Sequence, residues 1–127
     1  MPRPSSFDYA IIRLVPRVER EEFMNVGAIL FCRTRRFLAA QIALDSAKMA
    51  VFAPQLDKTR VEAQLALIPR ICAGEESPIG QLSQAERFHW LVNPRSTVVQ
   101  MSAVHSGLCD DPAEALARLV AQMVKGV

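Results

Sequence analysis

Two short apolar runs joined by a strongly polar connection constrain this chain more than any other feature. Residues 8–15 and residues 26–32 are each short enough for a strand, and the second run is apolar on both faces, as in a strand at the centre of a sheet. Pro16 ends the first strand because it removes a backbone donor. Gly27 suits a bulge or a close backbone approach. The pattern predicts two strands with a polar return between them.

The remaining chain adds two strands and four helices. Strands are expected at residues 37–44 and 97–101. Each helix follows a capping residue, and these residues are Asp45 or Ser46, Asp57, Ser83 with Glu86 as a capping box, and Asp111. Pro69 lies inside the second helical pattern and predicts a kink or a new turn. This order of elements predicts an α+β fold, with helices packed on an antiparallel sheet of about four strands.

The composition predicts a single small domain that folds without metal or disulfide. The chain has 127 residues, half of them hydrophobic, and a formal charge of +2. Its three cysteines lie far apart, which suits idle thiols in a reducing compartment. Residues 1–7 are predicted to be a disordered or extended tail before a domain at 8–127. Without a signal-like or membrane-spanning run, we expect a cytoplasmic protein, with no membrane partner, cofactor or metal.

Polar residues within and after the first apolar run are the main candidates for a site. Arg13 lies on a strand face, and a buried guanidinium needs an anionic or carbonyl partner. Because the polar connection must lead back to the end of the first strand, we expect Glu22 to pair with Arg13, directly or through Asn25. The same residues fit two interpretations. They form a structural ion pair, or the Arg13 guanidinium binds a phosphate or carboxylate ligand.

Two other groups of residues have mainly structural interpretations. Arg33, Arg35 and Arg36 form a basic hairpin tip, which suits a solvated loop or a phosphate contact. Nucleic acid is not favoured as a partner, because the chain has one Trp and one Tyr for base stacking. Trp90 is predicted to be a core anchor packed against the sheet.

The quoted residues carry a family resemblance. Two segments, Tyr9–Cys32 and then Arg87-Phe-His-Trp with Pro94-Arg-Ser, resemble a bacterial family known only as domain of unknown function 3037, DUF3037. The first segment carries the pattern of the family at Arg13, Pro16, Arg20, Glu22, Asn25 and Gly27. The resemblance implies a small bacterial cytoplasmic protein without an assigned activity. It also associates the family with neighbouring genes for HipA-like kinases, which implies a protein partner.

Two functional hypotheses follow. The first is a non-catalytic binding or accessory domain that engages a protein partner such as a HipA-like kinase. The second is an anion- or nucleotide-binding enzyme that uses Arg13, Arg87 and Arg95 with Glu21 or Glu22. No residue is assigned a catalytic role, and the binding candidates are Arg13, Arg20, Glu22, Asn25, Arg87 and Arg95. Convergence of these residues in one concave pocket would favour the enzyme, and their dispersal would favour the binding domain.

Overall fold

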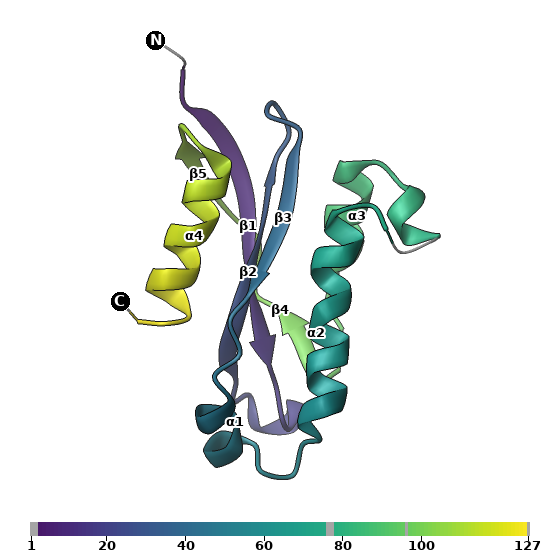
Figure 1. The fold of residues 1–127 in the computed structure, drawn as a ribbon, viewed down its shortest axis with the longest axis vertical. Coiled ribbons are helices and arrows are strands. Elements are labelled where there is room, and N and C mark those ends of the chain that lie inside the picture. Colours follow the sequence, from purple (N-terminus) through teal and green to yellow (C-terminus); the bar gives the residue numbers. More distant parts are fainter. Residues whose placement is uncertain (1–2, 76–77, 96, 127) are drawn as a thin grey trace.

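The computed structural model describes residues 3–75, 78–95 and 97–126 and shows an α+β fold (Figure 1). The strands are β1 (Ser5–Leu14), β2 (Met24–Cys32), β3 (Phe37–Ile42), β4 (Val99–Met101) and β5 (His105–Cys109). The helices are α1 (Ser46–Phe52), α2 (Lys58–Cys72), α3 (Gln84–Val92) and α4 (Pro112–Met123), with short 3-10 helices η1 (Val18–Arg20) and η2 (Ile79–Gln81). The predicted fold class is confirmed.

The sheet is antiparallel and is organised around β1. Its order is β3-β2-β1-β4, and β5 also pairs with β1, along a different part of that strand. β5 was not predicted, because Ser106 and Gly107 are poor strand formers. Its ladder of hydrogen bonds with residues 5–9 supplies the stability that its sequence lacks, and it explains why β1 begins at Ser5 rather than at residue 8.

Helices cover both faces of the sheet and form two cores. In Figure 1, α2 and α3 lie on one side of the strands and α4 lies on the other. The core under α2 and α3 includes Ile12, Leu65 and Phe88, and the core under α4 includes Leu30 and Val120. Within the described part of the chain, no helix combines the length and the apolar character that a membrane crossing requires.

The four predicted caps are confirmed, because each depends on contacts within one turn. A side-chain oxygen of Asp45, Asp57, Ser83 or Asp111 accepts a hydrogen bond from a backbone N–H in the first turn of its helix, at 3.0–3.2 Å. Glu86 completes the capping box by accepting from the Ser83 N–H at 3.1 Å.

Of the two outcomes predicted for Pro69, a kink or a new turn, the new turn does not occur. α2 continues past this residue to Cys72 and places Ile71 and Cys72 in the core. Proline removes one helical hydrogen bond here, three residues before the helix ends. Burial of these two side chains compensates for that loss. The helix ends after Cys72, and Gly74 has a φ of +82°, a conformation that glycine commonly supplies just after a helix end.

A bulge and a close strand approach set the geometry at the start of β2. Ile12 is opposite Gly27, whereas Arg13 is opposite Asn25, so Val26 has no partner on β1. A Cβ atom on Gly27 would lie 2.5 Å from the Gln41 carbonyl oxygen. Only glycine fits without displacing β3, and the bulge decides which side chains of β2 face α4.

Trp90 does not anchor the core, contrary to the prediction. Its side chain is 41% exposed, whereas Phe88 is 1% exposed and its ring centroid lies 5.4 Å from that of Phe31. Residues two apart on a helix point to nearly opposite sides, while residues three apart share a side. Phe88 and Leu91 therefore form the buried side of α3, and this leaves Trp90 at the surface.

Substitutions at these two aromatic positions should have clearly different effects. We expect Phe88→Ala to lower the free energy of unfolding by about 3–5 kcal/mol, because it leaves a cavity between α3 and the sheet. Trp90→Ala should lower it by about 1 kcal/mol, since much of the ring is already in water. Urea denaturation followed by circular dichroism measures both values. Equal losses would contradict the orientation of α3.

Candidate functional site

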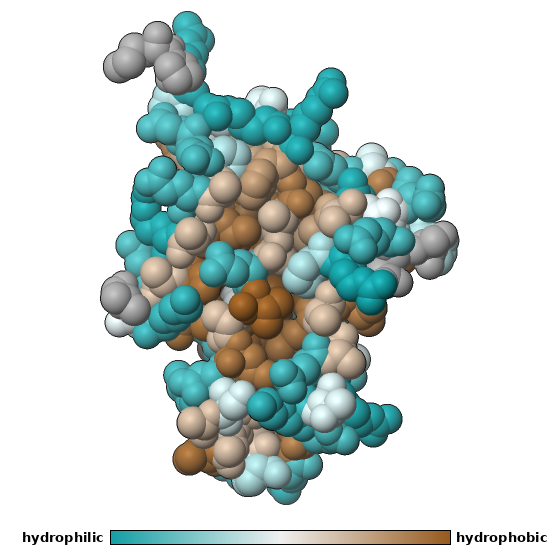
Figure 2. All heavy atoms as spheres, viewed as in Figure 1, coloured by the Kyte–Doolittle hydropathy of each residue, from teal (hydrophilic) through white to brown (hydrophobic). Residues whose placement is uncertain are grey.

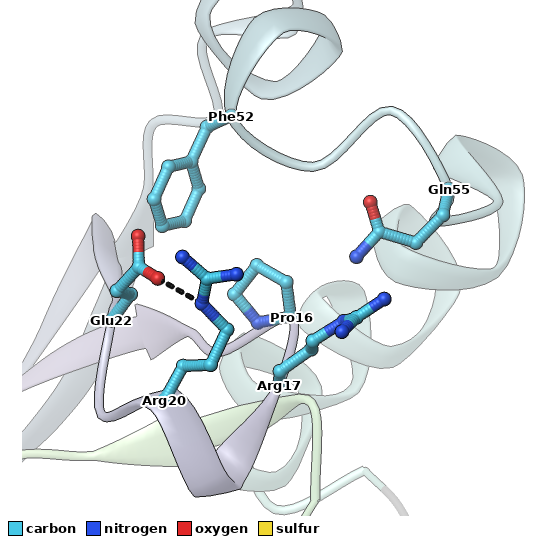
Figure 3. Close-up of a pocket in the computed structure, with 6 residues that line it drawn as sticks. All are labelled: Pro16, Arg17, Arg20, Glu22, Phe52 and Gln55. Carbon is cyan, nitrogen blue, oxygen red and sulfur yellow. Dashed lines mark hydrogen bonds and ion pairs between the residues drawn. The ribbon is translucent and has the colours of Figure 1, made fainter.

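The connection between β1 and β2 forms an ordered turn rather than a simple loop. Residues 18–20 form η1, and Glu21 follows in the left-handed conformation with a φ of 55°. The Glu21 N–H donates to the Val18 carbonyl oxygen at 3.2 Å and closes this turn. The turn is short, so it directs the side chains of Arg17, Arg20 and Glu22 toward the end of α1 (Figure 3).

These side chains line an open cleft with a volume of about 290 Å³. Its walls are Pro16, Arg17, Arg20, Glu22, Phe52 and Gln55. Figure 3 shows the Arg20 guanidinium beside the Glu22 carboxylate and below the Phe52 ring, and the Arg17 guanidinium on the side of Gln55. The cleft therefore joins the β1–β2 connection to the end of α1 and the turn that follows it.

The cleft carries more positive than negative charge. Arg20 Nε donates to Glu22 Oε1, and this ion pair is open to water, since the two side chains are 61% and 50% exposed. Within the described residues, the Arg17 side chain makes neither a hydrogen bond nor an ion pair. Glu22 neutralises one of the two guanidinium groups and leaves one positive charge for a ligand. A carboxylate or phosphate would complement this arrangement, with the Gln55 amide as a further donor.

Arg13 lies on the face of the sheet that α4 covers, the same face as Ile11. Its guanidinium carbon is 3.9 Å from the centroid of the Phe23 ring, as in a cation–π contact. Arg13 Nε is buried without a hydrogen-bond partner among the described residues, and so is Asn25 Oδ1. Asn25 Nδ2 donates to the Met123 carbonyl oxygen at 2.9 Å, so this side chain binds the last turn of α4.

The predicted pairing of Arg13 with Glu22 is wrong. Glu22 binds Arg20, and Asn25 binds α4, so neither the direct contact nor the contact through Asn25 exists. Side chains alternate along an extended chain. Asn25 stands opposite Arg13 in the strand register, so Phe23 lies on the Arg13 side and Glu22 on the opposite side.

Arg87 binds backbone groups at the end of α2. Its Nη1 donates to the Ile71 and Cys72 carbonyl oxygens at 3.0 and 2.6 Å, and its Nε donates to the Leu82 carbonyl oxygen at 3.0 Å. A cation at a helix C-terminus satisfies free carbonyl groups and complements the helix dipole. Arg87 thus ties α3 to the end of α2 and has a structural role.

Arg95 has the same role at the end of α3. It donates to the Leu91 and Trp90 carbonyl oxygens at 3.0 and 2.7 Å, and its guanidinium lies 4.4 Å from the centroid of the Trp90 ring. This ring and Leu67 border a mainly apolar groove of about 190 Å³ between α2, α3 and β4. The sequence contained a signal for the Arg95 cap, since this residue closely follows α3, but no local pattern marks Arg87, which lies inside α3 and caps α2.

The basic hairpin tip makes separate local contacts. Arg35 Nε donates to Ser5 Oγ at 3.0 Å, and the Arg33 guanidinium lies 5.7 Å from the Phe31 ring centroid. Arg36 has a φ of 51° and its carbonyl oxygen accepts from Gln84 Nε2 at 2.9 Å. These contacts give each arginine a different environment and do not gather the three charges around one ligand position.

The thiols are poor candidates for chemistry. Cys32, Cys72 and Cys109 are free and buried. Burial raises the pKa of Cys72 to about 12, although the nearby Arg87 charge acts in the opposite direction. Burial also raises the pKa of Cys109. A thiol with a raised pKa stays protonated near neutral pH and is a weak nucleophile.

The six predicted site residues are therefore distributed over four places. Arg20 and Glu22 meet in the cleft, Arg13 and Asn25 are near α4, and Arg87 and Arg95 cap two different helices. Sequence reasoning did not name Arg17 as a site residue, and it missed Phe52 and Gln55 as members of the cleft. No local pattern marks them, because the fold alone brings the end of α1 to the β1–β2 connection.

Comparison with known proteins places this arrangement in a family context. Residues 9–124 match the model of a family described as "Protein of unknown function (DUF3037)". Comparison with curated proteins and with solved structures gives no match. The family match covers nearly the whole chain and includes every residue of the cleft.

Double-mutant cycles should show which neighbour of Arg13 is coupled to it. Arg13→Met and Phe23→Leu remove one cation–π contact between them, so we expect a coupling free energy of about 0.5–1 kcal/mol. Arg13→Met and Glu22→Gln form the matched control, and their losses should add, because the side chains do not meet. Urea denaturation of each single and double variant gives the free energies of unfolding from which the coupling is calculated. A larger coupling with Glu22 than with Phe23 would contradict this geometry.

Proposed function

We propose that this chain, which belongs to the DUF3037 family, is a non-catalytic binding domain that engages a protein partner through the cleft. The observation that carries the proposal is the position of Arg17 and Arg20 in one open cleft, with Glu22 holding Arg20 in place. The cleft offers a positive charge and hydrogen-bond donors beside the apolar ring of Phe52. Such a site suits an acidic side chain that reaches in from a partner surface.

The dispersal of the arginines supports binding rather than catalysis. An enzyme that acts on an anion through Arg13, Arg87 and Arg95 needs these cations around one position. Arg87 and Arg95 instead donate to carbonyl groups at two separate helix ends, and Arg13 lies against Phe23.

The two acids proposed for catalysis have structural roles within the β1–β2 connection. Glu22 is the ion-pair partner of Arg20, and Glu21 occupies the left-handed position that closes the turn after η1. A general base needs a carboxylate placed beside the reacting group. Among the described residues neither acid contacts Arg87 or Arg95, which donate to backbone carbonyl groups, so the geometry favours a recognition site.

A HipA-like kinase in the bacterial cytoplasm is the partner that we propose to test. Family resemblance suggests this partner, and the charge of the cleft indicates the kind of surface that it would present. An exposed aspartate or glutamate of the kinase would insert between Arg17 and Arg20, with its aliphatic carbons against Phe52. Because the cleft is open to water, this contact contributes orientation and association rate more than affinity.

The test measures binding of a purified HipA-like kinase. Isothermal titration calorimetry should give a complex with the wild-type chain, and Arg17→Gln with Arg20→Gln should weaken it roughly tenfold or more. The loss should shrink at high salt, because screening already weakens the same attraction.

Arg118→Gln is the control for removal of a surface charge outside the cleft. Arg118 is 63% exposed on α4 and, within the described residues, pairs only with Glu114 at 3.3 Å, a surface pair of small energetic value. Its replacement should leave the dissociation constant unchanged. A wild-type chain that does not bind the kinase would reject this partner, and equal affinities of the cleft and control variants would reject the cleft.

A further inference from the structure

β3 lies at one edge of the sheet and leaves half of its backbone groups without a strand partner. In the described part of the chain it pairs only with β2, and Figure 1 is viewed from this edge, with α4 on one side and α2 and α3 on the other. Both α2 and α4 contact β3 across the faces of the sheet. The edge itself lies between these helices and is open in this view.

The strand lacks the features by which proteins protect an exposed edge. Residues 37–44 read Phe-Leu-Ala-Ala-Gln-Ile-Ala-Leu, without a charge, a proline or a glycine. Natural edge strands usually carry a charged side chain, a proline or a bulge that prevents pairing with another chain. The register of β3 with β2 is continuous from Phe37 to Ile42, so no bulge interrupts it.

The edge also presents apolar surface to solvent. All eight residues except Leu38 are partly exposed. Figure 2 shows a continuous hydrophobic area in the middle of this view, where β3 lies, with hydrophilic residues around it. A continuous apolar area on a small protein with a polar border is typical of an interaction surface.

The direction of the free backbone groups follows from the register. The Ala43 N–H donates to the Val26 carbonyl oxygen at 2.7 Å, which makes 26 and 43 a hydrogen-bonded pair. Such pairs recur every second residue in an antiparallel ladder, so Ala39 and Gln41 also face β2. The N–H and C=O groups of the intervening residues, Leu38, Ala40 and Ile42, point away from the sheet.

We propose that a second copy of this chain binds here, with its β3 antiparallel to the first about a twofold axis at Ala40. Ala40 stands opposite Ala40 of the second copy, and Leu38 stands opposite Ile42 of the second copy. The N–H and C=O groups of all three outward residues then find partners across the axis. The two sheets join into one continuous sheet.

The absence of charge favours a second copy as the occupant. A twofold interface sets the same surface against itself, so charges on the strand would meet like charges near the axis. β3 has none, and the proposed register pairs only apolar residues on the face toward α2 and α3. On the face toward α4 it sets Ala39 against Gln41, which is uncharged. The strand is thus complementary to itself.

This surface is separate from the cleft. No residue of β3 lines the cleft, so pairing of two copies does not depend on the proposed binding of an acidic partner. Failure of one proposal leaves the other intact, because the first is measured by kinase binding and the second by the mass of the chain alone.

Sedimentation velocity with the full chain tests the proposal. The wild-type chain should sediment as a dimer of the 14.1 kDa protomer, with a concentration-dependent monomer fraction. Ala40→Pro removes an N–H that faces away from β2 and sets the proline ring against the second copy, so the dimer should be lost. Ala40→Ser keeps the N–H at the same position and should remain dimeric.

Hydrogen exchange on the wild-type chain keeps the test decisive if Ala40→Pro does not fold. The amides of Leu38, Ala40 and Ile42 should exchange more slowly as concentration rises, whereas those of Ala39 and Gln41 should be protected at every concentration. A wild-type monomer at all concentrations overturns the proposal, as does a dimer that Ala40→Pro leaves intact. Protection of the outward amides only when the kinase is added would indicate a foreign strand and would also overturn it.

Discussion

The ladder between β1 and β2, with the bulge at Val26, is the interaction on which the rest of this structure depends. β1 is hydrogen-bonded on both sides, and its alternating side chains contribute to both cores. The bulge shifts the register by one residue, so Asn25 faces α4 while Val26 stays in the core under α2 and α3. Without this shift, the side chains before Gly27 would exchange faces.

Polar side chains that resemble a functional set mostly hold helix ends in place. Arg87, Arg95 and Asn25 each donate to a carbonyl oxygen in the last turn of a different helix. The last carbonyl groups of a helix have no hydrogen-bond partner within that helix. Long side chains from the neighbouring element reach them instead. The cleft is different, because among the described residues its Arg17 does not donate to a carbonyl group at a helix end.

The two proposed surfaces are compatible in space. The cleft lies at the end of the sheet where β3 leads into α1, and Phe52 belongs to both the cleft and that helix. An antiparallel pair about Ala40 places this end of one copy far from the same end of the other. A dimer would thus carry two clefts at opposite ends of one sheet, and a partner with two acidic segments would bind it with increased avidity.

The sequence by itself determined the features that depend on contacts within a few residues. The caps at Asp45, Asp57, Ser83 and Asp111, the stop at Pro16, the approximate positions of β1 to β4 and the fold class follow from side-chain chemistry and periodicity. The tertiary structure decided whatever depends on a partner distant in the chain. β5 exists because residues 5–9 pair with it, and Arg13 lies on Phe23 because the bulge sets its face. The cleft exists because α1 ends beside η1. Local chemistry limits the conformations of a segment, but only packing selects which distant side chains meet.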